Sequence, residues 1–471
     1  MRLKICSRKV ELYIPDMFFR GVMNGRLNRY DIAARYLAIE NYFGKNDFGF
    51  KLYSKMQELR MNIKGYGAKA ESQFRALLDS YQSGGYDRTS RIILDKTLSL
   101  LDGSHRIAAN IYFHEPMISA LSLGLITPID FSLDWFIANG FTHDEIDAIK
   151  SKADEIAQKL IQPFLCIVWS PAVKFAEEIA EDLKYFGEVS EIRHYTYSEE
   201  EYANIVRAVY SVDDIAKWKI EKKIQYMAGS GGNIALIPLT IKYPDFRVKG
   251  SSHLPLSRSL ERVKAAIRSR YKARIPNYFY DICFHVGDNY MQNDYIRNVF
   301  EPEIDMRGIM DIFSCYDYAF VKTDVPYMPA EFPERIPAGK DADILCSAES
   351  FSGIVNDIDS WCRNNTPYDV RTIAEEAGSR IRMELYGRLI YQIDISCEIL
   401  GLGAGFVNDA LKHKVHNGKY YIISPEYEYI YRFYVWSSNK CKAYHLDYLK
   451  NHRGDYDSSL ADKYCGDGIS L

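Results

Sequence analysis

Three aspartates in the last third of the chain have the spacing of a metal site. Asp341 and Asp343 fall in the segment AGKDADIL, a predicted strand in which side chains i and i+2 point to the same face. Asp394 lies in a second predicted strand, LIYQIDIS, where an acid among apolar residues is costly unless it is paired or bound to metal. Because two clustered carboxylates bind Mg²⁺ well, Asp341 and Asp343 form a candidate metal site, and Asp394 is a third candidate ligand.

A second segment suited to chemistry, Asp102-Gly103-Ser104-His105-Arg106, lies between a predicted strand and a predicted helix. The start of a helix offers unpaired backbone N–H groups and the positive end of the helix dipole. The glycine adds flexibility, and an arginine can bind phosphate through two hydrogen bonds. The segment therefore predicts a phosphate-binding turn, although ordinary turns also use Asp-Gly.

This turn and its surroundings resemble the ParB/sulfiredoxin superfamily over about residues 65 to 125. The shared pattern is DGSHRIAA at 102–109 after a short hairpin, with GGYD upstream at 84–87. Members include nucleotide-dependent DNA clamps, sulfiredoxin and free-serine kinases, which place a nucleotide phosphate on this turn. The resemblance implies that Asp102 orients magnesium or an acceptor hydroxyl, and that four residues contact phosphate: Gly103, Ser104, His105 and Arg106.

Two departures narrow what this resemblance implies. Sulfiredoxin carries a reactive cysteine in the turn where this sequence has Ser104, so that activity is not expected. The DNA clamps need a helix-turn-helix, which the sequence does not indicate. We therefore expect a kinase-like N-terminal activity, with a ParB-like nucleotide-dependent nucleic-acid-binding or regulatory protein as the alternative.

The C-terminal acids resemble the nucleotidyltransferase fold of the DNA polymerase beta superfamily over about residues 310 to 450. That superfamily includes aminoglycoside adenylyltransferases and LicD/fukutin-like sugar-modifying enzymes. The resemblance implies that Asp341, Asp343 and Asp394 hold a divalent metal that binds the phosphates of an ATP or CTP donor. It also implies that Asp394 can act as base for the acceptor hydroxyl.

The phosphate-contacting pair of this second resemblance is unusual. The family often has Gly-Ser or Gly-Gly there, whereas this chain has Gly339-Lys340. Lys340 either replaces a hydroxyl donor as a point charge for phosphate or marks a degenerate site. With a degenerate site, the chain would be a scaffold that keeps only the N-terminal phosphate site.

The middle of the chain offers a weaker candidate site. His285 lies at the carboxyl end of a predicted strand at 278–286 and Asp288 follows it, and α/β proteins often bind ligands at the carboxyl ends of strands. A lone histidine beside a turn is also a common structural residue. The cationic amphipathic helix predicted at 257–274 has two readings, a solvated face or a surface that receives an anionic substrate.

Composition limits the compartment and the partners. A formal charge of −4 and a pI near 6.2 argue against binding nucleic acid through bulk electrostatics. The nine cysteines have neither disulfide-framework nor zinc-site spacing, and no apolar run is long enough to span a membrane. We expect a cytoplasmic protein without a membrane span, while the sequence leaves the oligomeric state open.

The elements that must position these residues indicate a multidomain α/β and α+β protein. The sequence predicts a ParB/sulfiredoxin-like domain at 1–155, an α/β domain at 156–310 and a nucleotidyltransferase-like domain at 311–471. Buried strands alternating with helices favour parallel packing in the middle domain. The predicted strands of the last two domains cover 164–169, 189–194, 233–241, 278–286, 318–323, 342–346 and 389–396.

The two resemblances together suggest one function. We expect a Mg²⁺-dependent transferase that moves a phosphoryl or nucleotidyl group from ATP or CTP to a small hydroxyl-bearing acceptor, a sugar or an alcohol. Surface-polysaccharide biosynthesis is the setting suggested by analogy with the LicD-like enzymes.

Overall fold

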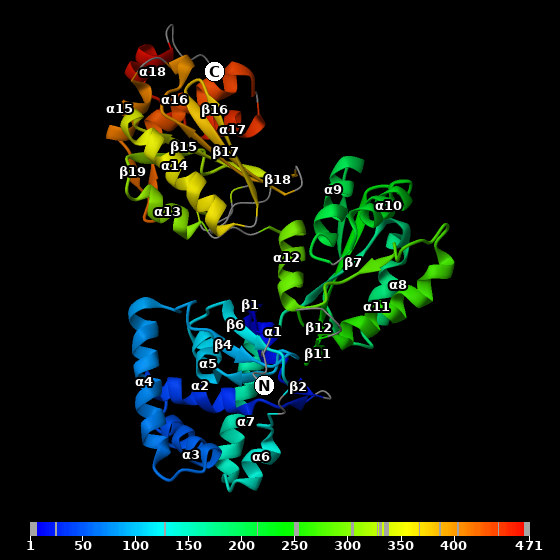
Figure 1. Cartoon of the computed structure of the whole chain (residues 1–471). Coiled ribbons are helices and arrows are strands. Elements are labelled where there is room, and N and C mark those ends of the chain that lie inside the picture. Colours follow the sequence, from blue (N-terminus) through cyan, green and yellow to red (C-terminus); the bar gives the residue numbers. More distant parts are fainter. Residues whose placement is uncertain are drawn as a thin grey trace. The chain divides into compact units, whose positions relative to one another are not determined.

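The computed structural model describes most of the 471 residues. The described ranges are 7–23, 26–126, 129–213, 215–248, 254–302, 306–326, 328, 332–333, 339–366, 368–385, 388–402, 405–440 and 442–465. They belong to two compact units (Figure 1). Unit 1 comprises Met1–Glu199 with Ile215–Ile296, and unit 2 comprises Glu200–Asp214 with Arg297–Leu471. Both units mix helices and strands, and the three-domain division stays a prediction.

The N-terminal part of unit 1 is a small sheet with several helices. Its elements are β1 (Ser7–Tyr13), α1 (Ile14–Phe19), β2 (Val22–Met23), β3 (Arg26–Leu27), α2 (Tyr30–Tyr42), α3 (Gly49–Met61), α4 (Tyr66–Gly84), β4 (Ile92–Leu94), β5 (Leu100–Asp102), α5 (Ser104–Tyr112), β6 (Met117–Leu123), α6 (Leu133–Ala138) and α7 (His143–Leu160). The four-stranded sheet has the order β1-β6-β4-β5.

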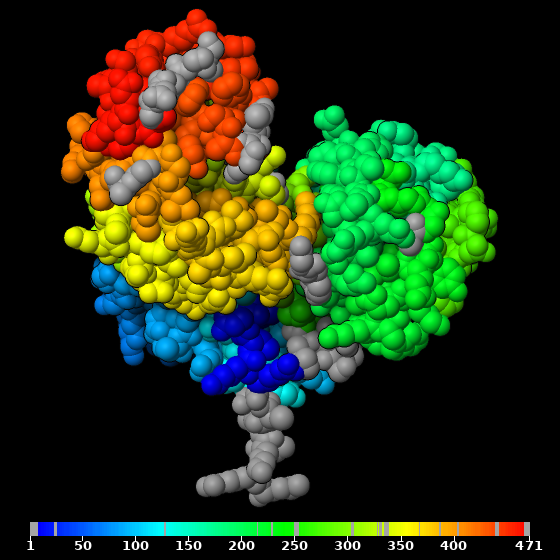
Figure 2. Space-filling view, turned by 90° about the horizontal axis from the view of Figure 1, so that it is seen from above, coloured from blue at the N-terminus to red at the C-terminus, as the bar shows by residue number. Residues whose placement is uncertain are grey.

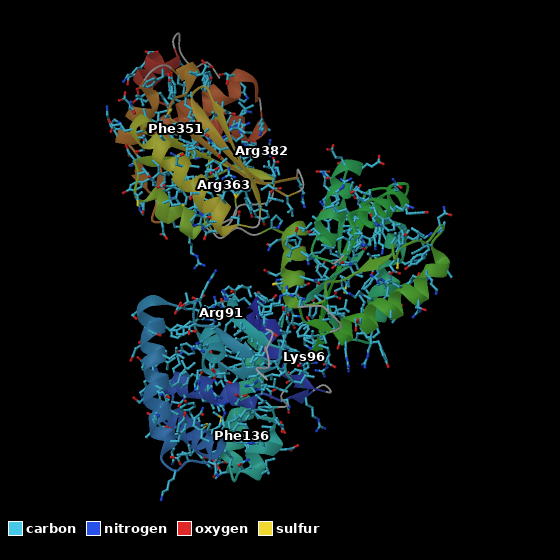
Figure 3. The ribbon with its side chains drawn as sticks, in the orientation of Figure 1. Arg91, Lys96, Phe136, Phe351, Arg363 and Arg382 are labelled. Atoms are coloured by element: carbon cyan, nitrogen blue, oxygen red, sulfur yellow. The ribbon has the colours of Figure 1, made fainter. Side chains whose placement is uncertain are left out.

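Helices α2, α3, α4, α5 and α7 form a connected layer in this part of unit 1. Phe136 of α6, labelled in Figure 3, is fully buried against Phe141 and Trp135. Helix α7 begins with a capping box, in which Thr142 and Glu145 each bond the other's backbone N–H. This local chemistry explains why the helix begins directly after Thr142.

The second part of unit 1 is an antiparallel sheet with helices. Its elements are β7 (Phe164–Val168), α8 (Ala176–Leu183), β8 (Glu188–Val189), β9 (Arg193–Thr196), α10 (Lys217–Ala228), β10 (Asn233–Thr240), β11 (Phe246–Arg247), β12 (Leu256–Ser257), α11 (Arg258–Tyr271), β13 (Phe284–His285) and the start of α12 (Tyr290–Phe300). The sheet order is β13-β7-β10-β8, and β9 also pairs with β10.

Two predictions for this second part are wrong. Every strand pair of its larger sheet is antiparallel, so the expected parallel packing does not occur. A buried apolar run shows that both faces of a strand are covered, but it carries no information on strand direction. The predicted strand at 278–286 shrinks to β13, because Tyr280 and Asp281 adopt left-handed φ values of 47° and 55°.

Asp16 connects the two parts of unit 1. It lies in α1 and is 2% exposed. Its carboxylate accepts hydrogen bonds from the backbone N–H groups of Tyr290 (2.7 Å) and Met291 (3.1 Å) at the start of α12. The acid therefore satisfies free backbone donors at the N-terminus of α12.

Unit 2 is built on a seven-stranded mixed sheet in the order β16-β17-β18-β15-β14-β20-β19. Its elements are α9 (Glu199–Tyr210, from its second residue), the end of α12, α13 (Arg307–Phe313), β14 (Tyr318–Val321), β15 (Lys340–Cys346), α14 (Ala348–Asn365), β16 (Asp369–Glu375), β17 (Gly378–Leu385), β18 (Arg388–Ser396), α15 (Phe406–Lys412), β19 (Val415–His416), β20 (Tyr421–Ile422), α16 (Pro425–Val435), α17 (Ala443–Asn451) and α18 (Ser458–Cys465). The predicted strands at 318–323, 342–346 and 389–396 correspond to β14, β15 and β18.

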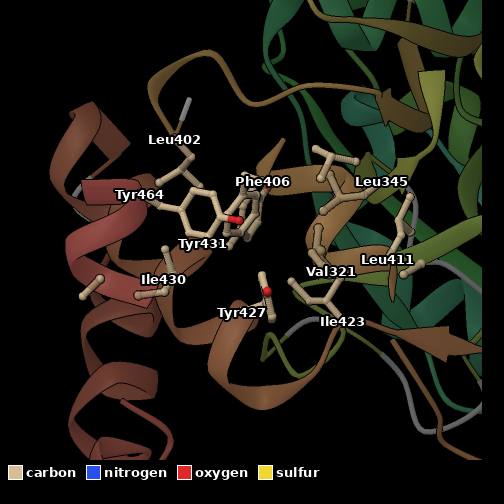
Figure 4. Close-up of a cluster of buried hydrophobic side chains, with 14 residues drawn as sticks. Val321, Leu345, Leu402, Phe406, Leu411, Ile423, Tyr427, Ile430, Tyr431 and Tyr464 are labelled. Carbon is tan, nitrogen blue, oxygen red and sulfur yellow. The ribbon is translucent and has the colours of Figure 1, made fainter. Parts of the chain in front are cut away.

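Helices α15, α16 and α18 cover one face of this sheet. Val321 of β14 and Leu345 of β15 pack there against Phe406, Ile430 and Tyr464 (Figure 4). In the space-filling view, residues coloured yellow to orange, from the region of α14 and β16–β18, gather on one face of unit 2 (Figure 2). Among the helices that the structure describes, none is long and apolar enough to cross a membrane.

Candidate metal centre and phosphate-binding turn

The three predicted acids of unit 2 come together on two adjacent strands. β15 runs parallel to β18, with Asp343 opposite Asp394 and Asp341 opposite Gln392. Since paired strands lie about 4.8 Å apart and residues i and i+2 share a face, this register brings the side chains of Asp341, Asp343 and Asp394 together. Each offers one carboxylate oxygen, and these oxygens lie within 4.8 Å of one another.

The position of the acids in the sheet explains their partial burial. Asp341, Asp343 and Leu345 alternate onto the same face of β15. Leu345 is in the apolar cluster beneath α15 and α16 (Figure 4), whereas the acids are nearer the start of the strand. The apolar end of the strand thus fixes the backbone that presents the carboxylates.

Two cations pair with these acids. Lys322, directly after β14, places Nζ 2.6 Å from Oδ2 of Asp343, and the side chain of Lys322 is only 8% exposed. Arg380 of β17 places Nε 3.0 Å from Oδ1 of Asp394. Gln392 donates from Nε2 to Oδ2 of Asp394 at 3.1 Å. The sequence prediction did not include these partners.

Burial and mutual repulsion dominate the electrostatics of the acids. Burial raises the pKa of Asp343, and Asp341 and Asp394 add to the effect, while Lys322 opposes it. Burial also raises the pKa of Asp394, with Arg380 opposing and Asp341 adding. An additional cation would relieve the repulsion that the neighbouring carboxylates exert on one another.

The donor set suits a hard divalent cation. All three candidate ligands are carboxylate oxygens, which Mg²⁺ prefers, and each acid is partly exposed. Gly339, with φ of +71°, and Lys340 precede Asp341 at the exposed start of β15. Gly339 donates its N–H to the carbonyl of Ile390 at 2.8 Å, which fixes the entry of the chain into the strand.

The N-terminal turn forms as the sequence predicts, between β5 and α5. Asp102 ends β5, and Gly103 precedes α5 with φ of +108°, a left-handed value that favours glycine. A Cβ atom at this glycine would lie 2.4 Å from Cγ2 of Ile92. The turn therefore requires glycine both for its backbone conformation and for its close approach to β4.

A buried ion network holds the turn from behind. Arg29 donates from Nη2 to Oγ of Ser104 at 3.0 Å and from Nη1 to the carbonyl of Leu100 at 3.1 Å. Arg29 also pairs with Asp31 at 2.8 Å, and Asp31 pairs with Arg35 at 2.9 Å. Ser104 is thus a bonded, largely buried part of the scaffold.

His105 is packed toward α3 and α4. Its Nε2 lies 2.7 Å from the hydroxyl oxygen of Tyr53, and its ring centroid lies 4.6 Å from that of Phe74. Burial lowers the pKa of His105 well below its ordinary value, and the charges of Arg35 and Arg60 add to this. A neutral histidine held in this way supports the turn, and the resemblance-based phosphate contact of His105 stays a prediction.

Comparisons with known proteins do not assign the chain. No family model, curated protein or solved structure matches it. The resemblances to the ParB/sulfiredoxin superfamily and to the nucleotidyltransferase fold therefore stay predictions. Any functional proposal has to rest on the geometry of the carboxylates and of the turn.

The middle candidates have structural partners. His285 of β13 is 2% exposed, and burial, followed by Lys264 and Arg268, lowers its pKa well below the ordinary value. Asp288 pairs with Lys264, and its carbonyl accepts from the N–H of Ser257 at 2.8 Å. These contacts tie α11 to the loop before α12. Neither residue lies in the acid cluster or in the turn of α5.

Sequence reasoning also missed a cavity of about 370 Å³ beside the turn. Asp102 and His105 line it together with residues of α3 and α4. Among these are Tyr53, Gln57 and Arg60, which recur at positions i, i+4 and i+7 on one face of α3. The sequence feature that could have indicated the cavity is Gln57, a polar residue at a buried position of the helix α3.

Proposed function

We propose that this chain is a Mg²⁺-dependent transferase that moves a phosphoryl or nucleotidyl group from ATP or CTP to a hydroxyl group of a sugar or alcohol. The observation that supports it is the meeting of Asp341, Asp343 and Asp394 from adjacent parallel strands, with candidate ligand oxygens within 4.8 Å of one another. In proteins, carboxylates and substrate phosphates together are the usual ligands of Mg²⁺.

The three acids would hold the metal, which when bound neutralises charge on the phosphate oxygens of the donor. Lys322 and Arg380 orient two of the carboxylates through the ion pairs described above. In the reaction, the acceptor oxygen bonds to phosphorus, the bond to the leaving phosphate oxygen breaks, and the hydroxyl proton passes to a base. Asp394 is suited to this role because burial raises its pKa, which makes its carboxylate a better base.

The direct test is phosphorus NMR of the protein with Mg²⁺, ATP or CTP, and a panel of sugars and alcohols. Nucleotidyl transfer releases pyrophosphate, whereas phosphoryl transfer releases ADP or CDP with a new phosphomonoester. Asp343→Asn should abolish turnover, and Asp462→Asn, which changes an exposed acid on α18, should leave it unchanged. Circular dichroism must show that both variants fold.

Two outcomes would contradict this proposal. One is that the wild-type protein consumes neither nucleotide with any member of the panel. The other is that folded Asp343→Asn retains wild-type turnover. By analogy with LicD-like enzymes, we propose surface-polysaccharide synthesis in the cytoplasm as the setting.

A second candidate function is nucleotide-dependent binding or regulation through unit 1. It is favoured by the left-handed Gly103 at the start of α5, where the turn presents a helix N-terminus next to Arg106. Calorimetry with ATP and CTP tests it. Binding without turnover that is lost in Gly103→Ala, and kept in Asp343→Asn, would favour this function over transfer.

A further inference from the structure

The cavity beside the N-terminal turn has the size of a small-molecule site. It occupies about 370 Å³ between α3, α4 and the end of β5. Small-molecule sites are concave and usually enclose a few hundred cubic ångströms, lined by apolar side chains and a few polar groups. Helices α3 and α4 lie side by side (Figure 1), and the turn before α5 completes the wall.

One buried polar group in the wall lacks a partner. Gln57 is 2% exposed, and among the described residues its Nε2 has no hydrogen-bond partner. The other buried residues of α3 are Gly49, Phe50, Leu52, Tyr53 and Met56. The hydroxyl of Tyr53 contacts His105, so it is already bonded, whereas Gln57, which lines the cavity, has a buried amide nitrogen without a partner among the described residues. An unpaired buried amide costs free energy that a ligand oxygen would recover.

The charges around the cavity favour an anionic ligand. Arg60 lines the cavity and is its side-chain cation, whereas Arg35, fully buried nearby, already pairs with Asp31 at 2.9 Å. The charges of both arginines act on His105, another residue of the wall. Asp102 is an exposed acid in the same wall, suited to accept a hydrogen bond from a hydroxyl group.

The remaining surfaces indicate a small ring or chain with polar substituents. Tyr53, Tyr66 and Phe74 supply aromatic walls, and Gln73 supplies a second amide that can donate and accept. Amides, one arginine and aromatic faces are a combination that binds hydroxylated organic anions.

We propose that this cavity binds a hydroxylated small-molecule anion, whose acid group is a carboxylate or a phosphate. Its acceptor oxygens bond Gln57 and Arg60, and a hydroxyl group faces Asp102. The cavity shares no residue with the metal centre in unit 2. Binding in the cavity can therefore be tested separately from the proposed transferase activity.

The test uses the full chain without Mg²⁺ or nucleotide. Isothermal titration calorimetry compares glycerol 3-phosphate and glucose 6-phosphate with glycerate and gluconate, and with neutral glucose and inorganic phosphate. We expect a hydroxylated anion to bind at least tenfold more tightly than glucose and than inorganic phosphate. The phosphorylated and carboxylated probes distinguish the two acid groups.

Variants connect binding to the wall of the cavity. Gln57→Leu and Arg60→Met should each weaken binding at least tenfold, whereas Lys51→Met, which removes an exposed cation from the same helix, should leave it unchanged. Gln57→Leu should also be at least as stable as the wild type, because it removes the unpaired amide. Asp343→Asn should bind the probe normally.

Three results would overturn the proposal. The first is that no anionic probe binds more tightly than glucose. The second is that binding survives both Gln57→Leu and Arg60→Met. The third is that Gln57→Leu lowers the thermal midpoint of the free protein, since the amide would then have a structural role.

Discussion

Replacing Asp31 by asparagine should strongly destabilise unit 1. The carboxylate of Asp31 accepts from Arg29 Nε (2.8 Å), Arg29 Nη2 (2.9 Å) and Arg35 Nη1 (2.9 Å). Arg35 is fully buried and the side chain of Arg29 is 9% exposed. Burial alone would raise the pKa of Asp31, but the two arginines hold it below its ordinary value, so the acid is charged at neutral pH.

The magnitude follows from these contacts. Asparagine keeps one acceptor oxygen and turns an NH₂ group toward a guanidinium, so the contacts to one carboxylate oxygen are lost. Hydrogen bonds to charged groups contribute about 1.5–3 kcal/mol each. The variant also leaves buried positive charge uncompensated, for which a cost of about 3–5 kcal/mol is typical. We therefore expect a loss of about 4 kcal/mol in unit 1.

The matched control is Glu71→Gln in α4. Glu71 and Arg75 also form an i,i+4 pair, at 2.8 Å, but their side chains are 30% and 43% exposed. An exposed pair contributes about 0–1 kcal/mol. Hydrogen exchange of α2 peptides measures the local free energy of opening, and peptides of β15 in unit 2 provide the internal reference. If Asp31→Asn costs no more than Glu71→Gln, the reasoning about the buried network is refuted.

Three further predictions concern the turn, the link to α12 and the metal centre. Gly103→Ala should lower the free energy of unfolding in urea by about 2–4 kcal/mol, because of left-handed backbone strain and the clash with β4. The control Gly44→Ala also has a left-handed φ, of +72°, but no atom within 4 Å of the added Cβ, so it should cost about 1 kcal/mol. Burial raises the pKa of Asp16 from 3.8 to about 7, so its contribution to stability is full below about pH 4 and falls as pH rises toward 7. Asp16→Asn should flatten that fall in unfolding free energy, and an unchanged slope would contradict the assignment. Asp343→Asn should remove the rise in thermal midpoint that Mg²⁺ with ATP or CTP gives the wild type, and an equal rise would contradict metal binding there.

The acid cluster could be predicted from sequence only in part. The shared face of Asp341 and Asp343 follows from the two-residue period of a strand, whatever the rest of the chain does. The approach of Asp394 depends on β18 being the neighbour of β15 and on the register that pairs it with Asp343. Adjacency and register are set by packing across the whole sheet, so a local pattern does not contain them.

The burial of polar side chains could not be predicted from the local sequence. His105 lies two residues after the glycine of the turn and packs toward Tyr53 and Phe74, a burial that the sequence did not indicate, while its expected phosphate contact stays a prediction. That outcome depends on the packing of α3 and α4, and Tyr53 of α3 lies 52 residues before His105 in the chain. The predicted strand direction in the second part of unit 1 was wrong because an apolar run such as β7 is buried in either orientation.

The charge balance at the acid cluster bears on how a metal would enter. Asp341, Asp343 and Asp394 each carry a negative charge when ionised, and Lys322 and Arg380 pair with Asp343 and Asp394. Such a site attracts free Mg²⁺ less than a set of acids without cations would, because the two side-chain cations lower the negative electrostatic potential at the carboxylates. A nucleotide brings its own anionic oxygens, which supply further ligands and a counter-charge for the two side-chain cations. If the proposed transferase activity holds, these ion pairs favour entry of Mg²⁺ and nucleotide together over a metal that is bound before the substrate arrives.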